Sequence, residues 1–198
     1  MNNTKLSRVT WLESFILKDK PQEHFSKLTN FVTVIICSFL LILSAKIKVD
    51  LYPVPMTLQP LAVLMIAMLC GRNISVAAVS LYLFQGIIGF PVFAYGGGVP
   101  YLLGPTGGFL FGFLFASILI GELADRGWGK FLFKSVFAML LGLFVIYSCG
   151  VFQLSILKGF DFAILNGLKP FIVGDLYKLI LAALLLPQIW KLVNKVKK

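Results

Sequence analysis

The chain has little charge, one histidine and no cysteine pair. Charged residues make up 13% of its 198 positions, about half the share that soluble domains usually carry. The one histidine, His24, stands in a polar N-terminal segment, which argues against a histidine-based metal centre or catalytic triad. Cys37, Cys70 and Cys149 lie singly in apolar stretches, so we expect small buried side chains rather than metal ligands.

The sequence also lacks the motifs of nucleotide hydrolysis and of common hydrolases. Its nearest match to the phosphate-binding pattern G-x-x-x-x-G-K-[ST] is the string ADRGWGKF at 124–131, which lacks the first glycine and the final serine or threonine. No H-E-x-x-H, no G-x-S-x-G and no acidic cluster for Mg²⁺ occurs. We therefore expect no bound cofactor and no ATP hydrolysis by this chain, so that uphill transport would need a partner.

Apolar residues dominate the sequence. They make up 59% of it, and the mean hydropathy is +0.92. One core of this size could not bury so much apolar surface, whereas lipid can cover it, so we predict an all-α integral membrane protein. Six spans of roughly 20 residues or fewer are expected, at about 28–46, 58–71, 74–88, from Pro105 to near Ile120, 131–155 and 170–192. The predicted organisation is a cytoplasmic tail (1–27), a six-helix membrane domain (28–193) and a basic cytoplasmic tail (194–198).

The connections between these spans differ in character. Only Gly71, Arg72 and Asn73 separate the second span from the third, which predicts a tight helical hairpin. The segments 48–60 and 89–108 are rich in proline and glycine, so they cannot stay helical throughout. Irregular backbone at membrane depth must be shielded by protein or line a cavity. We therefore expect both segments to fold into the protein.

Positive charge is distributed unevenly along the predicted topology. The formal net charge is +10, and with both termini inside, thirteen of the eighteen lysines and arginines fall on the inner side and four on the outer. This bias predicts cytoplasmic termini in a multi-pass protein of the cell membrane, with both proline- and glycine-rich segments outside. The four lysines of 191–198 suit anionic membrane lipid, so the basic balance is not taken as a sign of nucleic-acid binding.

Two ionisable residues fall within the last predicted span. Asp175 and Lys178 are three positions apart, which puts them on one helix face. Charges inside a span are costly unless they pair or face a polar cavity, so the two residues form either a structural ion pair or a polar ligand site. The uncharged polar residues Thr57, Gln59, Tyr82 and Gln85 lie near the outer ends of their spans, where interhelical hydrogen bonds are the commoner role.

Small residues recur at a spacing of four in the fourth predicted span. They are Gly104, Gly108, Gly112 and Ala116, and residues four apart share a helix face. Such a stripe lets another backbone approach closely. It can serve internal packing, which is the commoner case, or the docking of another subunit.

Four stretches together resemble one known family. They are PVPMTLQPL at 53–61, GFPVFAYGGG at 89–98, GPTGGFLFGF at 104–113 and GDLYK at 174–178. In this order they resemble the signatures of BioY, the biotin-binding S-component of energy-coupling factor (ECF) transporters. The resemblance implies a six-helix S-component-like bundle that captures biotin from the outer side and is not an enzyme. It also implies partner subunits: a membrane T-component and two ATPases.

The resemblance further implies a site in the last span. Asp175 and Lys178 match the polar pair that contributes to the family's biotin site, and we expect Lys178 to hold the carboxylate and Asp175 the ureido N–H groups, with support from Gln59 and Tyr82. The sequence departs from some family members at 95–98, where a cation for the carboxylate is absent. It also has leucines four positions before Ser44 and Ala45, where S-components tend to carry a small docking residue.

Two alternatives remain at this stage. One is an S-component-like subunit for another small vitamin. The other is a membrane-embedded enzyme acting on a lipid or an acyl chain, which would need clustered acid–base groups or metal ligands in the bundle.

Overall fold

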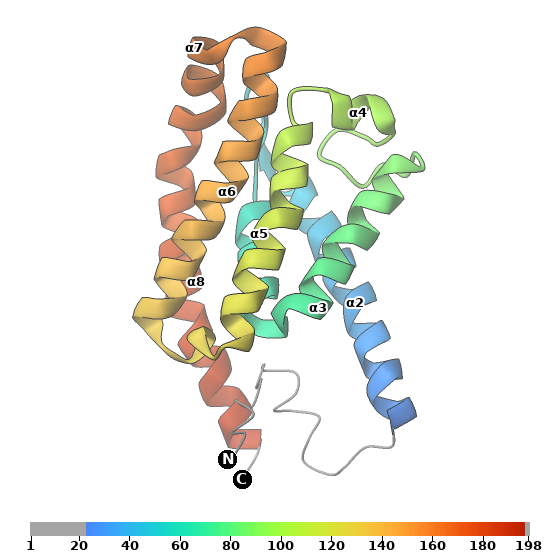
Figure 1. Ribbon diagram of the computed structural model, residues 1–198, viewed down its shortest axis with the longest axis vertical. Helices are drawn as coiled ribbons and strands as arrows, with labels where there is room; N and C mark the ends of the chain where they lie inside the picture. Colours follow the sequence, from blue (N-terminus) through green and yellow to red (C-terminus); the bar gives the residue numbers. More distant parts are fainter. Residues whose placement is uncertain (1–22, 197–198) are drawn as a thin grey trace, which may run out of the picture.

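The protein is a bundle of long helices with one minimal sheet (Figure 1). The computed structural model describes residues 23–196, so most of the predicted N-terminal tail and the last two lysines lie outside the described residues. The elements in chain order are α2 (Glu23–Lys46), β1 (Lys48–Val49), β2 (Met56–Thr57), α3 (Gln59–Ile87), α4 (Val99–Leu103), α5 (Gly107–Asp125), η1 (Trp128–Lys130), α6 (Leu132–Lys158), α7 (Phe160–Ala163), η2 (Ile164–Leu168) and α8 (Lys169–Val196). The helical region therefore reaches into both segments that were predicted as tails.

The element α3 is two helices joined by a sharp break. Gly71 has φ 75° and ψ −178°, a backbone conformation that glycine reaches without steric cost. Gln59 and Tyr82 are joined by a hydrogen bond of 2.7 Å, whereas 23 residues of straight helix would separate them by roughly 35 Å. The chain thus turns back at Gly71, as Figure 1 shows at the lower end of α3, and the predicted hairpin is confirmed.

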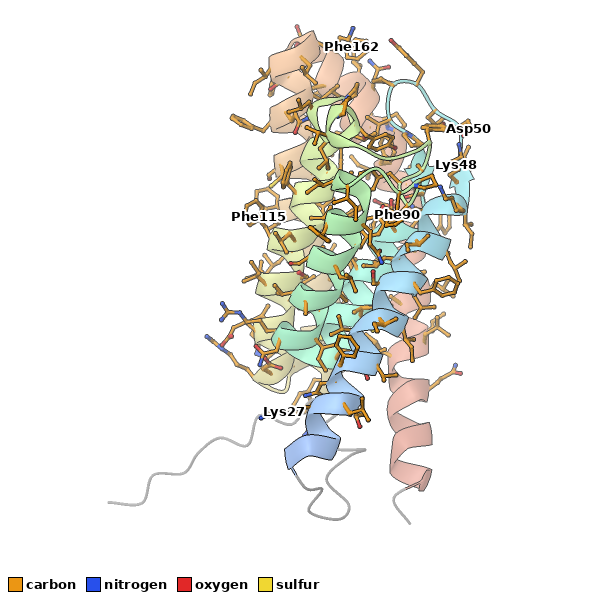
Figure 2. All side chains as sticks on the ribbon, turned by 90° about the vertical axis from the view of Figure 1, so that its right-hand side faces the viewer. Lys27, Lys48, Asp50, Phe90, Phe115 and Phe162 are labelled. Atoms are coloured by element: carbon orange, nitrogen blue, oxygen red, sulfur yellow. The ribbon has the colours of Figure 1, made fainter. Side chains whose placement is uncertain are left out.

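The long helices have one face buried in the bundle and another that exposes apolar side chains. Within the described residues, four helices are long and apolar enough to cross a bilayer: the described part of α2 from Lys27, and α3, α5 and α6. On α2 the buried residues recur at helical spacing, as Cys37, Leu41 and Ala45, while residues such as Phe31 and Phe39 stay exposed. Exposed apolar side chains on the outside of the bundle, such as Phe115 in Figure 2, suit a lipid environment.

The small-residue stripe on α5 packs within the chain. A Cβ added to Gly108 would lie 2.3 Å from the carbonyl oxygen of Cys149, and one added to Gly112 would lie 2.9 Å from Cα of Ile146. Both of these neighbours belong to α6. The backbones of α5 and α6 can approach this closely because α5 has glycine, with no side chain, at the contact. Internal packing, the commoner case, is confirmed for this face. Gly104 is not part of it, because α5 begins only at Gly107.

The two ends of the bundle differ in chemistry. At one end the α3 break meets the end of α5, where Glu122 pairs with Arg72 at 3.4 Å and with Arg126 at 3.2 Å. Lys27 lies toward the same end of the molecule (Figure 2). The opposite end carries α4, α7 and the segments around them (Figure 1). Three of the basic residues that the sequence assigned to the inner side, Lys27, Arg72 and Arg126, therefore lie at one end of the described bundle.

Both proline- and glycine-rich segments fold over this opposite end as lids. The first lid, residues 47–58, holds the short antiparallel pair of β1 and β2, in which Lys48 faces Thr57. The second lid, residues 88–106, inserts Phe93, which is fully buried and lies on Gly86, where an added Cβ would be 1.9 Å from its ring. The second lid also contains the short helix α4, which the sequence reasoning had treated as irregular.

Candidate functional site

A cavity lies beneath the two lids, between α3, α5, α6 and α8. The space free of atoms is about 520 Å³, including the open mouth. Apolar side chains form most of the wall, and the polar groups are few and convergent, as in small-molecule sites generally. The lining residues are Val54, Pro55, Thr57, Gln59, Pro60, Ala94, Tyr101, Thr106, Phe109, Leu110, Phe113, Ile146, Tyr147, Phe171, Asp175 and Lys178.

The polar wall of the cavity is built on α8 and α6. The Asp175 side chain is 3% exposed, and its two carboxylate oxygens have separate partners. Lys178 Nζ donates to Oδ1 at 2.5 Å, and the Tyr147 hydroxyl donates to Oδ2 at 2.5 Å. A buried carboxylate is tolerated when it is paired and hydrogen-bonded in this way. The predicted proximity of Asp175 and Lys178 is therefore observed, with Tyr147 as a third member.

The lysine of this wall also joins α8 to the first lid. Lys178 Nζ donates to the Thr57 carbonyl oxygen at 2.7 Å, and Thr57 lies directly before α3. The ammonium group thus has one hydrogen bond to an acid, one to a backbone carbonyl, and a third N–H available to a ligand. Lys178 is the one cation among the described residues that line the cavity.

Of the two predicted supporting residues, Gln59 lines the cavity and Tyr82 does not. Gln59 lines the cavity, and its amide nitrogen donates to the Tyr82 hydroxyl at 2.7 Å. Tyr82 is 0% exposed and does not line the cavity. It lies behind Gln59 and packs edge-on against Phe93, with ring centroids 5.4 Å apart. The structure therefore places Tyr82 where it can orient Gln59 but not where it touches the cavity.

A cluster of charged and aromatic residues joins the two lids. Lys48 pairs with Asp50 at 2.9 Å and lies 3.3 Å above the ring centre of Tyr95. The Tyr95 hydroxyl donates to the same Asp50 oxygen at 2.7 Å. The Tyr95 hydroxyl and the Lys48 ammonium together lower the pKa of Asp50. Because Lys48 and Asp50 belong to the first lid and Tyr95 to the second, we name this cluster the lid clamp.

Two further side chains fix the second lid to the bundle. Lys46 Nζ, at the end of α2, donates to the carbonyl oxygens of Pro91 at 2.7 Å and Phe93 at 2.6 Å. From α6, the Gln153 amide donates to the carbonyl oxygens of Leu102 at 2.9 Å and Gly104 at 2.7 Å, where α4 ends. The Gln153 bonds satisfy backbone acceptors that the end of the short helix α4 leaves free.

Sequence reasoning missed Tyr147 and Gln153, although both carry a signal. Each is a polar residue within the long apolar run of α6, and such residues usually find a partner on another element. The identity of that partner depends on how α6 packs against α8 and α4, which the residue pattern alone does not give.

The arrangement is suited to binding rather than to bond making. Asp175 has both oxygens occupied, and residues 23–196 contain no group of three or more histidine, cysteine or acidic side chains that could hold a metal. The wall presents a hydrogen-bond acceptor and a donor side by side, with paired charges. Such a wall recognises a polar group within an otherwise apolar ligand.

Fold and site together define a membrane-embedded helical protein with a lidded ligand cavity at one end of the bundle. Comparison with known proteins then gives the family: the chain belongs to the BioY family, whose model matches residues 18–195.

Individual relatives agree with this assignment. The chain is 40% identical over 160 residues to a biotin transporter BioY of Thermotoga maritima, covering 77% of this chain and 90% of that protein. It is 37% identical over 135 residues to a probable biotin transporter BioY of Pyrococcus horikoshii, covering 68% and 79%. Among solved structures, it resembles the S-component for biotin from an ECF-type ABC transporter, with a TM-score of 0.75 and 25% identity, over 86% of this chain and 95% of that one.

Proposed function

We propose that this protein is the substrate-capturing subunit of a biotin uptake system and is not an enzyme. The single observation that carries the proposal is the lidded apolar cavity with the buried group of Asp175, Lys178 and Tyr147 in its wall. Relatives named as biotin transporters and the likeness to an S-component for biotin support it. Biotin combines an apolar ring and chain with a ureido group at one end and a carboxylate at the other, which suits an apolar cavity with few polar contacts.

Charge balance favours the ureido group as the partner of Asp175 and Lys178. The two charges compensate each other across 2.5 Å, so the pair as a whole is neutral. A ureido group is also neutral and offers N–H donors to Asp175 and a carbonyl acceptor to Lys178. A carboxylate placed on Lys178, as the sequence reasoning expected, would add an uncompensated negative charge beside a side chain that is 3% exposed, and buried unpaired charge costs several kcal/mol.

The two placements of the carboxylate predict different ligand preferences. If Lys178 holds the carboxylate, Lys178→Met weakens biotin binding and leaves biotinamide, which lacks the charge, much less affected. If Lys178 holds the ureido group, the same substitution weakens both ligands alike. Gln59, which lines the cavity beside Thr57, is proposed as a supporting contact, and Tyr82 as the residue that orients it.

The proposed topology has six crossings with both termini in the cytoplasm. It counts α3 twice because of the break at Gly71 and includes α8. Support comes from Lys27, Arg72 and Arg126, which lie at the end opposite the lids, since short inner loops carry the excess of lysine and arginine. The lidded cavity then opens to the outside of the cell membrane.

The proposed partners are an ECF T-component and ATPase subunits. Their support is the likeness to an S-component from such a transporter and the lack of a nucleotide-binding motif in the sequence. The small residues Ser44 and Ala45 of α2 are buried within this chain, and the glycines of α5 pack on α6. A membrane partner is therefore proposed to contact other, exposed parts of the helices.

The decisive experiment is uptake of tritiated biotin into cells that lack their own biotin transporter. We expect uptake when this chain is co-expressed with ECF subunits, and loss of uptake with Asp175→Asn. No uptake by the wild-type chain, with or without those subunits, together with no biotin binding by the purified protein, would reject the proposal.

A further inference from the structure

The helical segment that carries Asp175 buries one residue in every four. From α7 through η2 into α8, the buried positions are Ala163, Gly167, Phe171, Asp175 and Leu179. An α-helix has 3.6 residues per turn, so each step of four advances the side chain by about 40° around the helix axis. Over the twelve residues from Ala163 to Asp175 the advance adds up to about 120°. A regular α-helix would therefore point these two residues to different faces.

The wide turn η2 removes most of this difference, because it contains one residue more than an α-helical turn. The backbone N–H of Lys169 bonds to the carbonyl oxygen of Ile164, five residues earlier, whereas an α-helix bonds four residues earlier. Residues beyond the wide turn are placed as if the chain were one residue shorter, a change of about 100°. The angle between Ala163 and Asp175 then falls from about 120° to about 20°, so both lie on one face.

The packing against α6 shows the same extra residue. Gly167 lies against Leu154 of α6, since a Cβ added to it would be 2.8 Å from Leu154 Cδ2. Asp175 accepts a hydrogen bond from Tyr147 of α6 at 2.5 Å. Tyr147 and Leu154 are seven residues apart, about two α-helical turns, whereas Gly167 and Asp175 are eight apart. The stretch that faces two turns of α6 thus holds one residue more.

The sequence around η2 favours a wide turn at this place. Pro170 follows Lys169 directly, and a proline within a helix lacks the N–H donor and clashes with the carbonyl group four residues earlier, which here belongs to Asn166. The Asn166 side-chain amide donates to the carbonyl oxygen of Phe162 at 3.0 Å, which adds a bond where the regular ladder is interrupted. The proline explains why the turn widens here, whereas the spacing of the buried residues explains why it has to widen.

A regular turn in place of η2 would carry the polar wall out of the cavity. If α7 kept its packing on α6, Asp175 and Lys178 would rotate by about 100°. Asp175 would then leave Tyr147 and take the position that Leu176, which is 47% exposed, holds on the outer face. A charged pair on a face that suits lipid is costly, and the cavity would lose its polar group.

We propose that the extra residue of η2 is the positioning element of the ligand wall, because it sets the rotation of α8 that turns Asp175 and Lys178 into the cavity. The inference rests on the proposed function for the identity of the ligand. The residues of η2, all of which the structure describes, do not line the cavity. The element therefore acts through α8 and not by contact with the ligand.

The test is equilibrium binding of tritiated biotin to purified variants of η2 in a Pro170→Ala background, in which a regular helix can form. Deletion of Leu165, which is 53% exposed, should keep the Kd within about threefold, because a regular helix one residue shorter has Asp175 in place. Insertion of one alanine after Leu165 should raise the Kd at least about a hundredfold, because both polar side chains leave the cavity. Pro170→Ala alone should bind within about threefold, since the spacing still requires the wide turn.

A rescue variant separates rotation from folding. In the insertion variant, the sites of Asp175 and Lys178 are taken by the residues one position earlier, Gly174 and Tyr177. Adding Gly174→Asp, Asp175→Gly, Tyr177→Lys and Lys178→Tyr moves the polar pair back by one residue. This variant should recover at least about tenfold of the lost affinity, which repair of stability alone would not do.

The outcomes decide between this inference and its alternatives. Loss of binding by the deletion variant, folded or not, rejects the inference, because the extra residue would then not be the one that the helix can spare. Equal binding by the deletion and insertion variants rejects it as well and makes the segment a flexible connection. Loss of binding in Pro170→Ala assigns the rotation to the proline and also rejects it. Gel filtration shows which variants fold, and the deletion variant decides alone if the insertion variant does not. In all these cases biotin binding by the wild-type chain leaves the proposed function standing; a wild-type chain that binds no biotin rejects that function, and this inference with it.

Discussion

Replacing Tyr147 with phenylalanine tests the polar wall of the cavity most selectively. The substitution keeps the ring and removes only the hydroxyl that donates to Asp175 Oδ2 at 2.5 Å. Lys178 still donates to the other carboxylate oxygen of Asp175, but the buried Oδ2 loses its donor. The change therefore removes one hydrogen bond and little packing.

The expected size of the effect follows from the charge and burial of the acceptor. Interhelical hydrogen bonds in membranes average about 0.6 kcal/mol, with a maximum near 1.7, whereas hydrogen bonds to charged groups contribute roughly 1.5–3 kcal/mol. For a carboxylate that is 3% exposed we expect a loss of about 1.5–2 kcal/mol of unfolding free energy. For a protein of this length, that corresponds to a decrease in Tm of roughly 3–8 °C.

The assay is thermal unfolding of the detergent-solubilised protein, followed by equilibrium binding of biotin. Tyr177→Phe is the matched control, because Tyr177 lies on α8 two residues from Asp175 but is 70% exposed, and such positions usually change stability by less than about 0.5 kcal/mol. Biotin affinity should fall in Tyr147→Phe as well, since Asp175 loses a contact that orients it. Equal Tm values and equal biotin affinities for the two variants would refute this account of the wall.

Four further predictions follow from the fold and the lids. Gly71→Ala should destabilise the protein by about 1–2 kcal/mol, because alanine is strained at φ 75°; an unchanged Tm would mean that the break can form another way. Gly112→Leu should abolish folding or biotin binding rather than partner assembly alone, because its side chain would overlap α6; normal binding with lost co-purification of a T-component would assign this face to docking. Single cysteines at Asp50, Tyr95 and Lys158 should react with an impermeant maleimide from outside the cell, and one at Gly127 should not; the reverse pattern would overturn the topology. The lid clamp should contribute the same stability throughout about pH 6–8, so Tm should not depend on pH there because of this pair. Tyr95 and Lys48 lower the pKa of Asp50, so the stability from its ionised form is present above the ordinary carboxyl range and is lost only in stronger acid, and, against partial desolvation, Asp50 raises the pKa of Lys48. A step in Tm within this interval would show that another group titrates at the clamp.

The helices and the hairpin at Gly71 could be predicted from the sequence, because they depend on the pattern of neighbouring residues. Long apolar runs predicted the helices, and the short interruption around Gly71 predicted the hairpin, because both signals are contained within a few neighbouring residues. The same holds for the partnership of Asp175 and Lys178, since residues three apart on a helix must share a face. The lids were also foreseen, because uncharged irregular backbone at membrane depth has to be covered by protein.

Contacts between distant segments were beyond sequence reasoning. Tyr147 donates to Asp175 across 28 positions, and Lys178 donates to Thr57 across 121. Nothing in the local pattern selects these partners, because they depend on the rotation and depth of each helix in the bundle. The same limit applies to Tyr82, whose polar hydroxyl suggested a ligand contact but which the packing of Phe93 buries behind Gln59.

The most direct test of the central claim is equilibrium binding of tritiated biotin to the purified chain, compared with a variant whose cavity is filled. Leu110 lines the cavity and is 4% exposed, so Leu110→Trp should occupy the space that the ligand needs. Phe111→Trp is the control, because Phe111 is the next residue of α5 and is 42% exposed on the outside of the bundle. We predict saturable binding of biotin by the wild-type chain and by Phe111→Trp, and none by Leu110→Trp. Absence of binding by the wild-type chain, or full binding by a folded Leu110→Trp, would contradict the account.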